Sequence, residues 1–457
     1  MSTVDAGTPR IGFGRTDITP PVGVELAGFG PYLRRRSTRV HGRLHAGAIA
    51  VEHGGGRWVL VSCDLLGLGR WIVDDVVARV GAATGWQPHE VAVHATHNHS
   101  GPATVENVGW GEPDPLYLAQ LPALIAEAAV AAVAARAPAT VAHAEVPLPG
   151  FAHNRMRERR GLTNAHALAG TWQEPEPELV DRGVHVLRVD HGGHLAGFLA
   201  SYSCHPVICC EQTDAVHGDF PGEALRLVEQ TRPGAVGVFA QGALGDVNPL
   251  YAHGPAEESY AALALFAGRF AGAISTGLDS AAAVPVEGVA AHRATLHPAL
   301  GPFDVDELRR RRDRALATVA ATPADTTSRE KAMAGVVANS LGATLARLER
   351  GEDAGPPVLV QALRLGPVSL LGFGLEVFHG IKRRLQQQLG DRCLVLSTTG
   401  GWSGYAPTPD AYRPPADPYP AYEVPLIACR LPFHDRIADD LVAAGVAAHA
   451  HVTSPRP

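Results

Sequence analysis

No segment of the sequence has the features of a membrane span or a secretory leader. Among its 457 residues there is no window of ~18 apolar residues free of charge, the length that a membrane-spanning helix needs. The nearest candidate, 121–135, is rich in alanine and interrupted by Glu127, so it predicts a buried helix. The stretch 1–7 lacks a charged region followed by an apolar one. These absences predict a cytoplasmic protein with no transmembrane segment.

Charged residues and cysteines are also few. Charged side chains make up 19% of the chain, the net charge is −7 and no long basic run occurs, which argues against binding to nucleic acid. None of the six cysteines forms a Cys-x-x-Cys pair, so reduced core residues are the simplest interpretation. A metal role stays open for Cys204, Cys209 and Cys210 because they flank His205, although their spacing matches no zinc knuckle.

Apolar residues are plentiful, at 46% of the chain, and they occur in short strands mixed with helices. This mixture predicts an α/β protein with mixed β-sheets packed in the centre and flanked by α-helices. A charged helical segment is expected at 305–350, and no linker divides the chain, which predicts one domain over 1–457. The Pro- and Tyr-rich stretch 402–425 predicts a loop that lines the site. Strands are expected at 48–52, 58–62, 90–96, 141–146, 183–189, 195–203, 235–240, 358–365 and 368–373, and helices at 71–85, 118–136, 221–230 and 376–389.

The most informative stretch is 91–102, Val-Ala-Val-His-Ala-Thr-His-Asn-His-Ser-Gly-Pro. An apolar strand runs into a polar loop there, and on an extended backbone residues two apart point to the same side. His97 and His99 would then face one point while His94 faces away, and histidine pairs suit zinc. A metallo-β-lactamase site would need Asp and His where the sequence has Gly-Pro. An amidohydrolase barrel would need repeated strand–helix units that the chain does not show.

Later segments add polar residues where strands end. Each has a plain structural explanation when taken alone. His205 could be a core histidine with satisfied hydrogen bonds. Glu376 could be a first-turn carboxylate of the helix expected at 376–389, with His379 one turn later as a weaker ligand candidate. The glycine-rich loop 241–249 could be a tight turn or a close approach to a ligand.

Together these pieces resemble the neutral/alkaline (non-lysosomal) ceramidase family, and they follow the family's order over about residues 11–425. The resemblance implies the fold of that family's N-terminal catalytic domain. The matching elements are Asp17-Ile-Thr-Pro-Pro, Ala27-Gly-Phe-Gly, Ser62-Cys-Asp64, Ala95-Thr-His-Asn-His-Ser-Gly-Pro, Asn154-Arg155, His205-Pro206, Gly218-Asp219, the 241–249 loop, Gly374-Leu-Glu376 and Gly404-Tyr405.

The resemblance implies one zinc ion per chain and a set of four ligands that lie far apart in the sequence. A free phenol titrates near ~10, so only a bound cation would make a tyrosine oxygen a good ligand near neutrality. The implied ligands are His97, His205, Glu376 and Tyr405.

The implied reaction is hydrolysis of an amide by zinc-activated water. His99 would relay a proton to the departing amine, and Arg155 or Tyr422 would steady the oxyanion. Asn248 stands where the family has a serine, so we expect a smaller or more polar N-acyl substrate than ceramide. No immunoglobulin-like domain is expected after the catalytic domain.

Other interpretations stay open. A zinc esterase or lactonase could use the same site, and a non-catalytic binding protein could keep the fold after losing turnover through Asn248. The expected partner is a small N-acyl or lipid-like molecule. A homo-oligomer, a second structural cation and the roles of His217 and Asp219 are not decided by the sequence.

Overall fold

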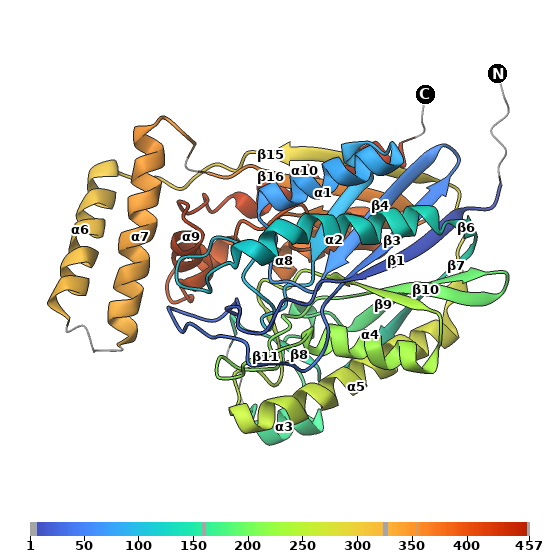
Figure 1. Ribbon diagram of the computed structural model, residues 1–457, viewed down its shortest axis with the longest axis horizontal. Helices are drawn as coiled ribbons and strands as arrows, with labels where there is room; N and C mark the ends of the chain where they lie inside the picture. The colour runs from blue at the N-terminus through green and yellow to red at the C-terminus, as the bar shows by residue number, and fades with distance from the viewer. Residues whose placement is uncertain (1–6, 158–160, 323–327, 354, 455–457) are drawn as a thin grey trace.

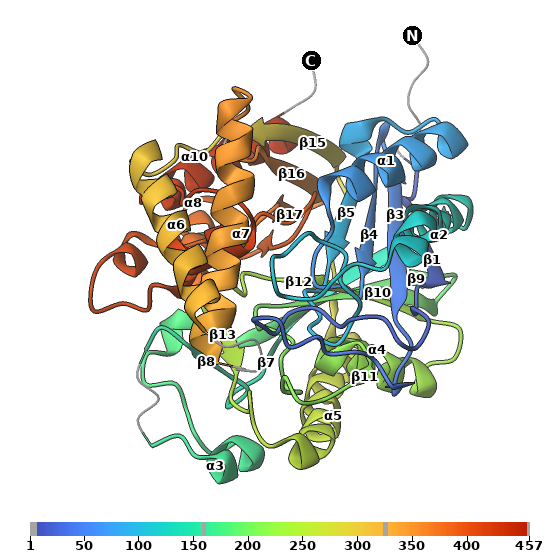
Figure 2. The same ribbon diagram turned by 60° about the vertical axis from the view of Figure 1, so that its left-hand side comes forward.

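The computed structural model describes residues 7–157, 161–322, 328–353 and 355–454 (Figure 1). Within these residues three sheets have four or five strands each. Leu60, Leu187, Leu199, Leu363 and others from all three sheets share one buried apolar cluster. The sheets therefore pack together in the centre of the molecule, and helices cover their outer faces (Figures 1 and 2). This arrangement confirms the expected fold class.

The N-terminal sheet has the strand order β5-β4-β3-β1-β6. Helices α1 (Arg70–Thr84) and α2 (Pro115–Ala134) cover it and share its apolar core. Gly12 and Gly14 on β1 allow the close approach of α2, because an added Cβ would come within 2.3 and 2.2 Å of helix carbonyl oxygens. The strands are β1 (Arg10–Asp17), β3 (His45–His53), β4 (Gly56–Cys63), β5 (Val91–Ala95) and β6 (Ala137–Pro138).

The second sheet has the order β12-β10-β9-β7-β14, and helices α4 (Asp219–Thr231) and α5 (Ala256–Ser280) lie on it. Phenylalanine rings join these helices to the sheet: Phe239 of β12 lies 6.4 Å from Phe220 of α4 and 5.7 Å from Phe270 of α5 between ring centroids. The strands are β7 (Thr140–Pro147), β9 (Gly183–His191), β10 (His194–Tyr202), β12 (Val236–Gln241) and β14 (Ala282–Ala283).

The third sheet, of order β15-β16-β17-β19, packs with α8 (His379–Leu389) and α10 (Ile437–Thr453). Beside it, α6 (Val305–Ala321) and α7 (Arg329–Glu349) form a hairpin that projects from the main body (Figure 1). The strands are β15 (Val289–Leu296), β16 (Val358–Leu365), β17 (Val368–Phe373) and β19 (Cys393–Leu396).

Short paired strands bring distant loops together at one place. Strand β8 (Ala152–Asn154) pairs with β13 (Val247–Pro249), and β18 (Glu376–Val377) pairs with β20 (Tyr405–Ala406). A further short pair joins β2 (Arg39–Val40) to β11 (Ala215–Val216). These pairs set the positions of the loops that form the site.

Most expected elements lie within a few residues of their observed bounds, but one expectation was wrong. Glu376 does not lie in the first turn of a helix; it belongs to β18, and α8 begins only at His379. The segment 305–350 is helical as expected and forms two helices, α6 and α7, while its residues 323–327 lie outside the described residues. The long helix α5 had no counterpart in the sequence analysis.

Two helices, α2 and α5, are long and apolar enough to cross a membrane by length and composition. The expectation of no transmembrane segment stays a prediction. In the structure each helix contributes its apolar face to a core cluster, with Leu121 and Ile125 from α2 and Phe266 and Phe270 from α5. Length and composition alone do not assign either helix to a membrane, since a core helix satisfies the same test.

Candidate metal centre

Four of the predicted residues meet at one point, and each is carried there by the end of a strand or by a short strand pair. His97 follows β5, and His205 follows β10. Glu376 and Tyr405 are directly opposite each other in the β18–β20 pair. This pairing explains how two residues 29 positions apart reach the same site.

The distances show a tight convergence of donor atoms. His97 Nε2 lies 3.3 Å and His205 Nε2 lies 3.2 Å from the same atom, Glu376 Oε2. The Tyr405 hydroxyl lies 3.5 Å from His205 Nε2. His97, His205 and Glu376 are each 2% exposed and Tyr405 is 5% exposed. The four side chains therefore form one buried group.

The hydrogen bonds on the other side of each imidazole fix which nitrogen faces this group. His97 Nδ1 is 2.8 Å from the Leu66 carbonyl oxygen, and His205 Nδ1 is 3.1 Å from the Val247 carbonyl oxygen. A carbonyl only accepts, so each Nδ1 carries a proton. In the neutral form of each ring, the form that ligates a metal, the Nε2 lone pair is then directed toward Glu376. Two lone pairs and a carboxylate then face one another, an arrangement that a cation stabilises. The residues present thus fit a metal ion.

The route by which His97 reaches the site differs from the prediction. The sequence analysis placed His97 and His99 on the same side of an extended strand. In the structure β5 ends at Ala95, and His97 has φ = 66°, in the left-handed region. The two rings still lie 4.9 Å apart. His94 does face away, with Nδ1 2.9 Å from Thr399 Oγ1 and Nε2 accepting from the Gln241 amide at 2.8 Å.

His99 lies beside the convergence point but has no hydrogen-bond partner among the described residues for either buried ring nitrogen. His97, His99 and His205 offer ring nitrogens that all lie within 4.8 Å of one another. Burial, and then the neighbouring His97 and His205, lower the pKa of His99 well below its usual range. The ring is thus neutral, and both of its nitrogens are available to hydrogen-bond a bound molecule.

Arg155 lies over the phenol that points into the site. Its guanidinium carbon is 5.0 Å from the centroid of the Tyr405 ring and 5.9 Å from that of Tyr419. Burial raises the pKa of Tyr405 well above its usual range, while the charge of Arg155 acts in the opposite direction. The arginine therefore favours the phenolate that a metal ligand needs. Its main chain is held by the Asp246 carbonyl, which accepts from the Arg155 amide at 2.8 Å.

The carboxylate of Glu376 is held at both ends. Its Oε2 faces the two histidines, and its Oε1 accepts a hydrogen bond of 2.8 Å from the indole N–H of Trp402. Burial raises the pKa of Glu376, but the nearby His97 and His205 lower it further, and the net pKa is well below the usual range. Glu376 is therefore ionised, as a metal ligand would be.

A cavity of about 370 Å³ opens onto the cluster, and it shows which other predicted residues belong to the site. His99, Arg155 and Asn248 line this cavity together with His205 and Tyr405. The Asn248 side-chain oxygen is buried and has no partner among the described residues, so it is free to accept from a bound molecule. Asn248 sits in β13 opposite His153, which places it at the cavity wall.

Tyr422 was also predicted for the site, but the structure does not place it at this cavity. Tyr422 is 43% exposed and donates its hydroxyl proton to the Tyr412 carbonyl. Tyr419, three residues earlier, lines the cavity instead, with its ring 6.2 Å from that of Tyr405. The segment Tyr419–Glu423 is a π-helix, whose wider turn moves side chains off the spacing that sequence comparison assumes. His379, the weaker candidate, faces Asp181 at 3.7 Å rather than the cluster.

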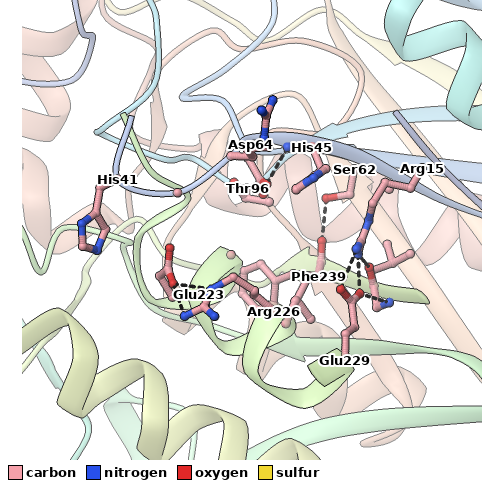
Figure 3. A pocket seen from close by; sticks show the side chains of 17 residues that line it. Arg15, His41, His45, Ser62, Asp64, Thr96, Glu223, Arg226, Glu229 and Phe239 are labelled. Atoms are coloured by element: carbon pink, nitrogen blue, oxygen red, sulfur yellow. Dashed lines mark hydrogen bonds and ion pairs between the residues drawn. The ribbon is translucent and has the colours of Figure 1, made fainter. Parts of the chain in front are cut away.

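A second cavity lies behind the site and has a different character (Figure 3). It measures about 290 Å³, and Thr96 lines it while the next residue, His97, belongs to the metal cluster. Its charges are mostly paired within the wall: Arg15 with Glu229 and Arg226 with Glu223. Among the described residues that line it, there is no group of three ligand-type atoms within 4.8 Å of one another.

Cys209, His217 and Asp219 form another buried group, whose ligand-type atoms lie within 4.8 Å of one another. Here the protein itself occupies the lone pairs. His217 Nδ1 accepts from the Asp219 amide at 3.1 Å, and Asp219 accepts from the amides of Phe220, Ile208 and Cys209 at 2.7 to 3.5 Å. The structure thus gives Asp219 and His217 the role of bracing the loop around β11.

Fold and site together define a mixed α/β enzyme with a buried histidine–carboxylate–tyrosine centre that can hold a metal. The family model for neutral/alkaline non-lysosomal ceramidase, N-terminal, matches residues 10–261. The chain belongs to this ceramidase family and is a hydrolase of that family.

Solved structures agree with this assignment at the level of the fold. One, described as a ceramidase complexed with C2, has a TM-score of 0.72 and 18% identity, covering 98% of this chain and 77% of the other. A neutral ceramidase from Pseudomonas aeruginosa has a TM-score of 0.69 and 19% identity, covering 99% and 77%. A search of curated proteins found no match.

Proposed function

We propose that this protein is a zinc-dependent amidohydrolase that cleaves linear N-acyl compounds, with ceramide itself not its main substrate. The observation that carries the metal part is the convergence of two histidine Nε2 atoms on one carboxylate oxygen, at 3.3 and 3.2 Å. His97, His205, Glu376 and Tyr405 would hold the ion. Nitrogen and oxygen donors in a set of four are typical of zinc. Bound zinc supplies an activated water and polarises the acyl oxygen.

His99 is the residue placed to move a proton. Its two ring nitrogens are buried and without partners among the described residues, and its ring contacts that of His97. A neutral imidazole beside the cleaved bond takes up a proton and then donates it to the departing amine nitrogen. The lowered pKa of His99 favours the donation step because the protonated ring is costly in this buried position.

Arg155 and Asn248 are placed to bind the acyl group. Both line the cavity that opens on the cluster. One terminal nitrogen of Arg155 is buried and has no hydrogen-bond partner within the described part of the chain, so its N–H is available to an oxyanion. The Asn248 amide can donate to an acyl oxygen or accept from an amide N–H, but it cannot act as the hydroxyl of a serine. The presence of Asn248 where the family has a serine supports a substrate that differs from ceramide.

The proposal is tested by measuring the hydrolysis of matched amides and esters of the same acyl groups by purified, zinc-loaded protein. We expect amides to be hydrolysed, with His205→Ala inactive on all of them. The variant His94→Gln is a useful comparison, because His94 is a buried histidine that faces away from the cluster. Equal activity of the wild type and His205→Ala would contradict the proposal, and activity on esters alone would support the esterase alternative.

A further inference from the structure

A cavity of about 480 Å³ adjoins the metal cluster, with Trp402 in the wall between them. Trp402 and Asn107 line this cavity and also the space beside His97 and Glu376. The indole N–H of Trp402 bonds Glu376 Oε1 at 2.8 Å, which holds the indole in this wall. The proposed reaction makes no use of the larger space, which is called the Trp402 cavity below.

Two arginines in the wall of the Trp402 cavity have no carboxylate partner. Among the described residues, neither Arg347 nor Arg430 forms an ion pair, and Arg347 instead donates to the carbonyl of Cys429. Arg430 is 2% exposed, and its Nε and Nη1 donate to the carbonyls of Ser403 and Leu431 at 2.7 and 2.9 Å. Its Nη2 has no hydrogen-bond partner in the described part of the chain, and the buried Nε of Arg347 has none either. Both guanidinium groups therefore have N–H donors to spare.

The buried guanidinium of Arg430 calls for an anion. Burial lowers its pKa to about 9, which still leaves the side chain charged near neutral pH. The ring of Phe433, whose centroid is 3.8 Å from the guanidinium carbon, compensates part of the lost hydration. A buried charge without a partner is costly, and an arginine cannot reduce that cost by giving up its proton near neutrality. An anion bound in the cavity would remove the cost.

The charges of the wall match an anion that carries one negative charge. Arg70 also lines the cavity, but its guanidinium is already paired with Asp74 at 2.9 Å. Glu106 is the one acidic residue among the described residues of the wall; it is exposed and pairs with neither Arg347 nor Arg430. Two unpaired arginines and one carboxylate leave a single positive charge. A carboxylate carries one charge and accepts two parallel bonds from a guanidinium, whereas a phosphate group carries about −1.5 to −2.

The rest of the wall suits an apolar body attached to that carboxylate. Trp71 is 51% exposed and Trp402 is partly buried, and both indoles line the cavity. Val105, Pro113 and Leu118 add aliphatic surface to the same wall. Aromatic faces bury a large apolar area against a ligand. The volume of about 480 Å³ also lies in the range of small-molecule sites, about 300–1,000 Å³.

We propose that the Trp402 cavity binds an organic carboxylate, with its charged group at Arg347 and Arg430 and its apolar body against Trp71. None of the four candidate metal ligands lines this cavity, so the site is separate from the zinc site. The inference does not rest on the proposed function, although the hydrolysis of an N-acyl amide releases a molecule of this class. Binding makes and breaks no covalent bond.

Calorimetry with 3-phenylpropionate tests the inference, and 3-phenylpropionamide is the neutral probe of the same shape. Zinc-loaded and chelator-treated wild type are titrated in parallel, because a carboxylate can also bind to zinc. We expect both forms to bind the acid at this site and neither to bind the amide measurably. Arg347→Met and Arg430→Met should each weaken binding by about tenfold or more, since hydrogen bonds to charged groups are the strong ones. Arg70→Met is the matched control: it lines the same cavity with its charge already paired, and it should bind as the wild type does.

Each alternative result decides the inference. Equal binding of acid and amide, no binding of the acid, or wild-type affinity in Arg347→Met would overturn it. Because Arg347 is only partly buried, that variant keeps the test decisive if Arg430→Met does not fold. A purely structural role of Arg430 would lower the free energy of unfolding in Arg430→Met and leave the affinity unchanged. Tighter binding of inorganic phosphate than of 3-phenylpropionate would overturn the choice of a carboxylate. None of these titrations depends on amide hydrolysis, so the proposed function is judged separately.

Discussion

The protein contains two buried groups of metal-ligand side chains, and they use their lone pairs differently. Around His97 and His205, backbone carbonyls hold the Nδ1 protons, so both Nε2 atoms face the same carboxylate oxygen, Glu376 Oε2. Around His217 and Asp219, backbone amides already bond His217 Nδ1 and the carboxylate. We infer that metal binding belongs to the first group, because its side-chain donor atoms converge beside an accessible cavity.

Removing a ligand from the first group should give the largest effect. We expect His205→Ala to lose its zinc and at least about a thousandfold in kcat/KM, because the metal supplies most of the activation. Zinc content per chain and the rate of amide hydrolysis are the measurements. If zinc stays bound in both His205→Ala and His97→Ala, the first group is not the zinc site.

The same truncation in the second group should affect folding instead. His217→Ala removes the acceptor of the buried Asp219 amide and leaves a cavity, so we expect the free energy of unfolding to fall by about 2–4 kcal/mol. Zinc content should not change. Chemical denaturation and metal analysis on the same preparation test this, and a loss of zinc without a loss of stability would reverse the roles of the two groups.

Trp402→Phe sharpens the account of the first group. The substitution keeps an aromatic ring but removes the N–H that bonds Glu376 Oε1. Partners of metal ligands are typically worth about 10–100-fold in metal affinity, so we expect a weaker zinc dissociation constant by about tenfold. Trp86→Phe is the control, since Trp86 is buried in the N-terminal core away from the cluster. Unchanged zinc affinity in Trp402→Phe would show that the hydrogen bond does not orient the ligand.

The smallest expected effect concerns the pH dependence of the free energy of unfolding, compared between the wild type and a variant at His217. Burial, and then the nearby His41 and Arg35, lower the pKa of His217 to about 3. Below about pH 6.5 the histidine therefore takes up a proton in the unfolded state but stays neutral in the folded state. The stability that His217 contributes is present above that pH and is lost as the pH falls toward 3.

As the pH falls, the free energy of unfolding should decrease less steeply in His217→Gln than in the wild type. We expect the two slopes to differ by up to about 1.4 kcal/mol per pH unit. Denaturation curves of both proteins between pH 7 and pH 4 give the difference, in which the contributions of all other groups cancel. Parallel curves would show that His217 titrates normally and is less enclosed than the structure indicates.

The sequence allowed much of the fold to be predicted, because strand and helix periodicity is local. The hairpin of β3 and β4 and the buried strand β12 follow directly from apolar runs. The helix α5 was missed because it begins at Pro255 without a side-chain cap and its sequence is rich in small residues. Local patterns could not show where β18 replaces a helix turn, because that strand exists only through its partner β20.

The site was predictable to different degrees for similar reasons. His97 lies in a motif dense with histidine, so the sequence pointed to it even though its left-handed backbone contradicts the extended geometry used to argue for it. Tyr405 has no local signal and came only from the family resemblance. Trp402 and Tyr419 lie in the stretch 402–425 that was predicted to line the site, but they could not be singled out within it, because their roles depend on a long-range hydrogen bond and on a π-helical turn.

Anomalous diffraction at the zinc absorption edge, from crystals of the purified protein, tests the central claim most directly. The account predicts one strong peak within bonding distance of His97 Nε2, His205 Nε2, a Glu376 carboxylate oxygen and the Tyr405 hydroxyl, and no peak at Cys209, His217 and Asp219. A peak at the second group, or a zinc-loaded protein with no peak at the first, would contradict it.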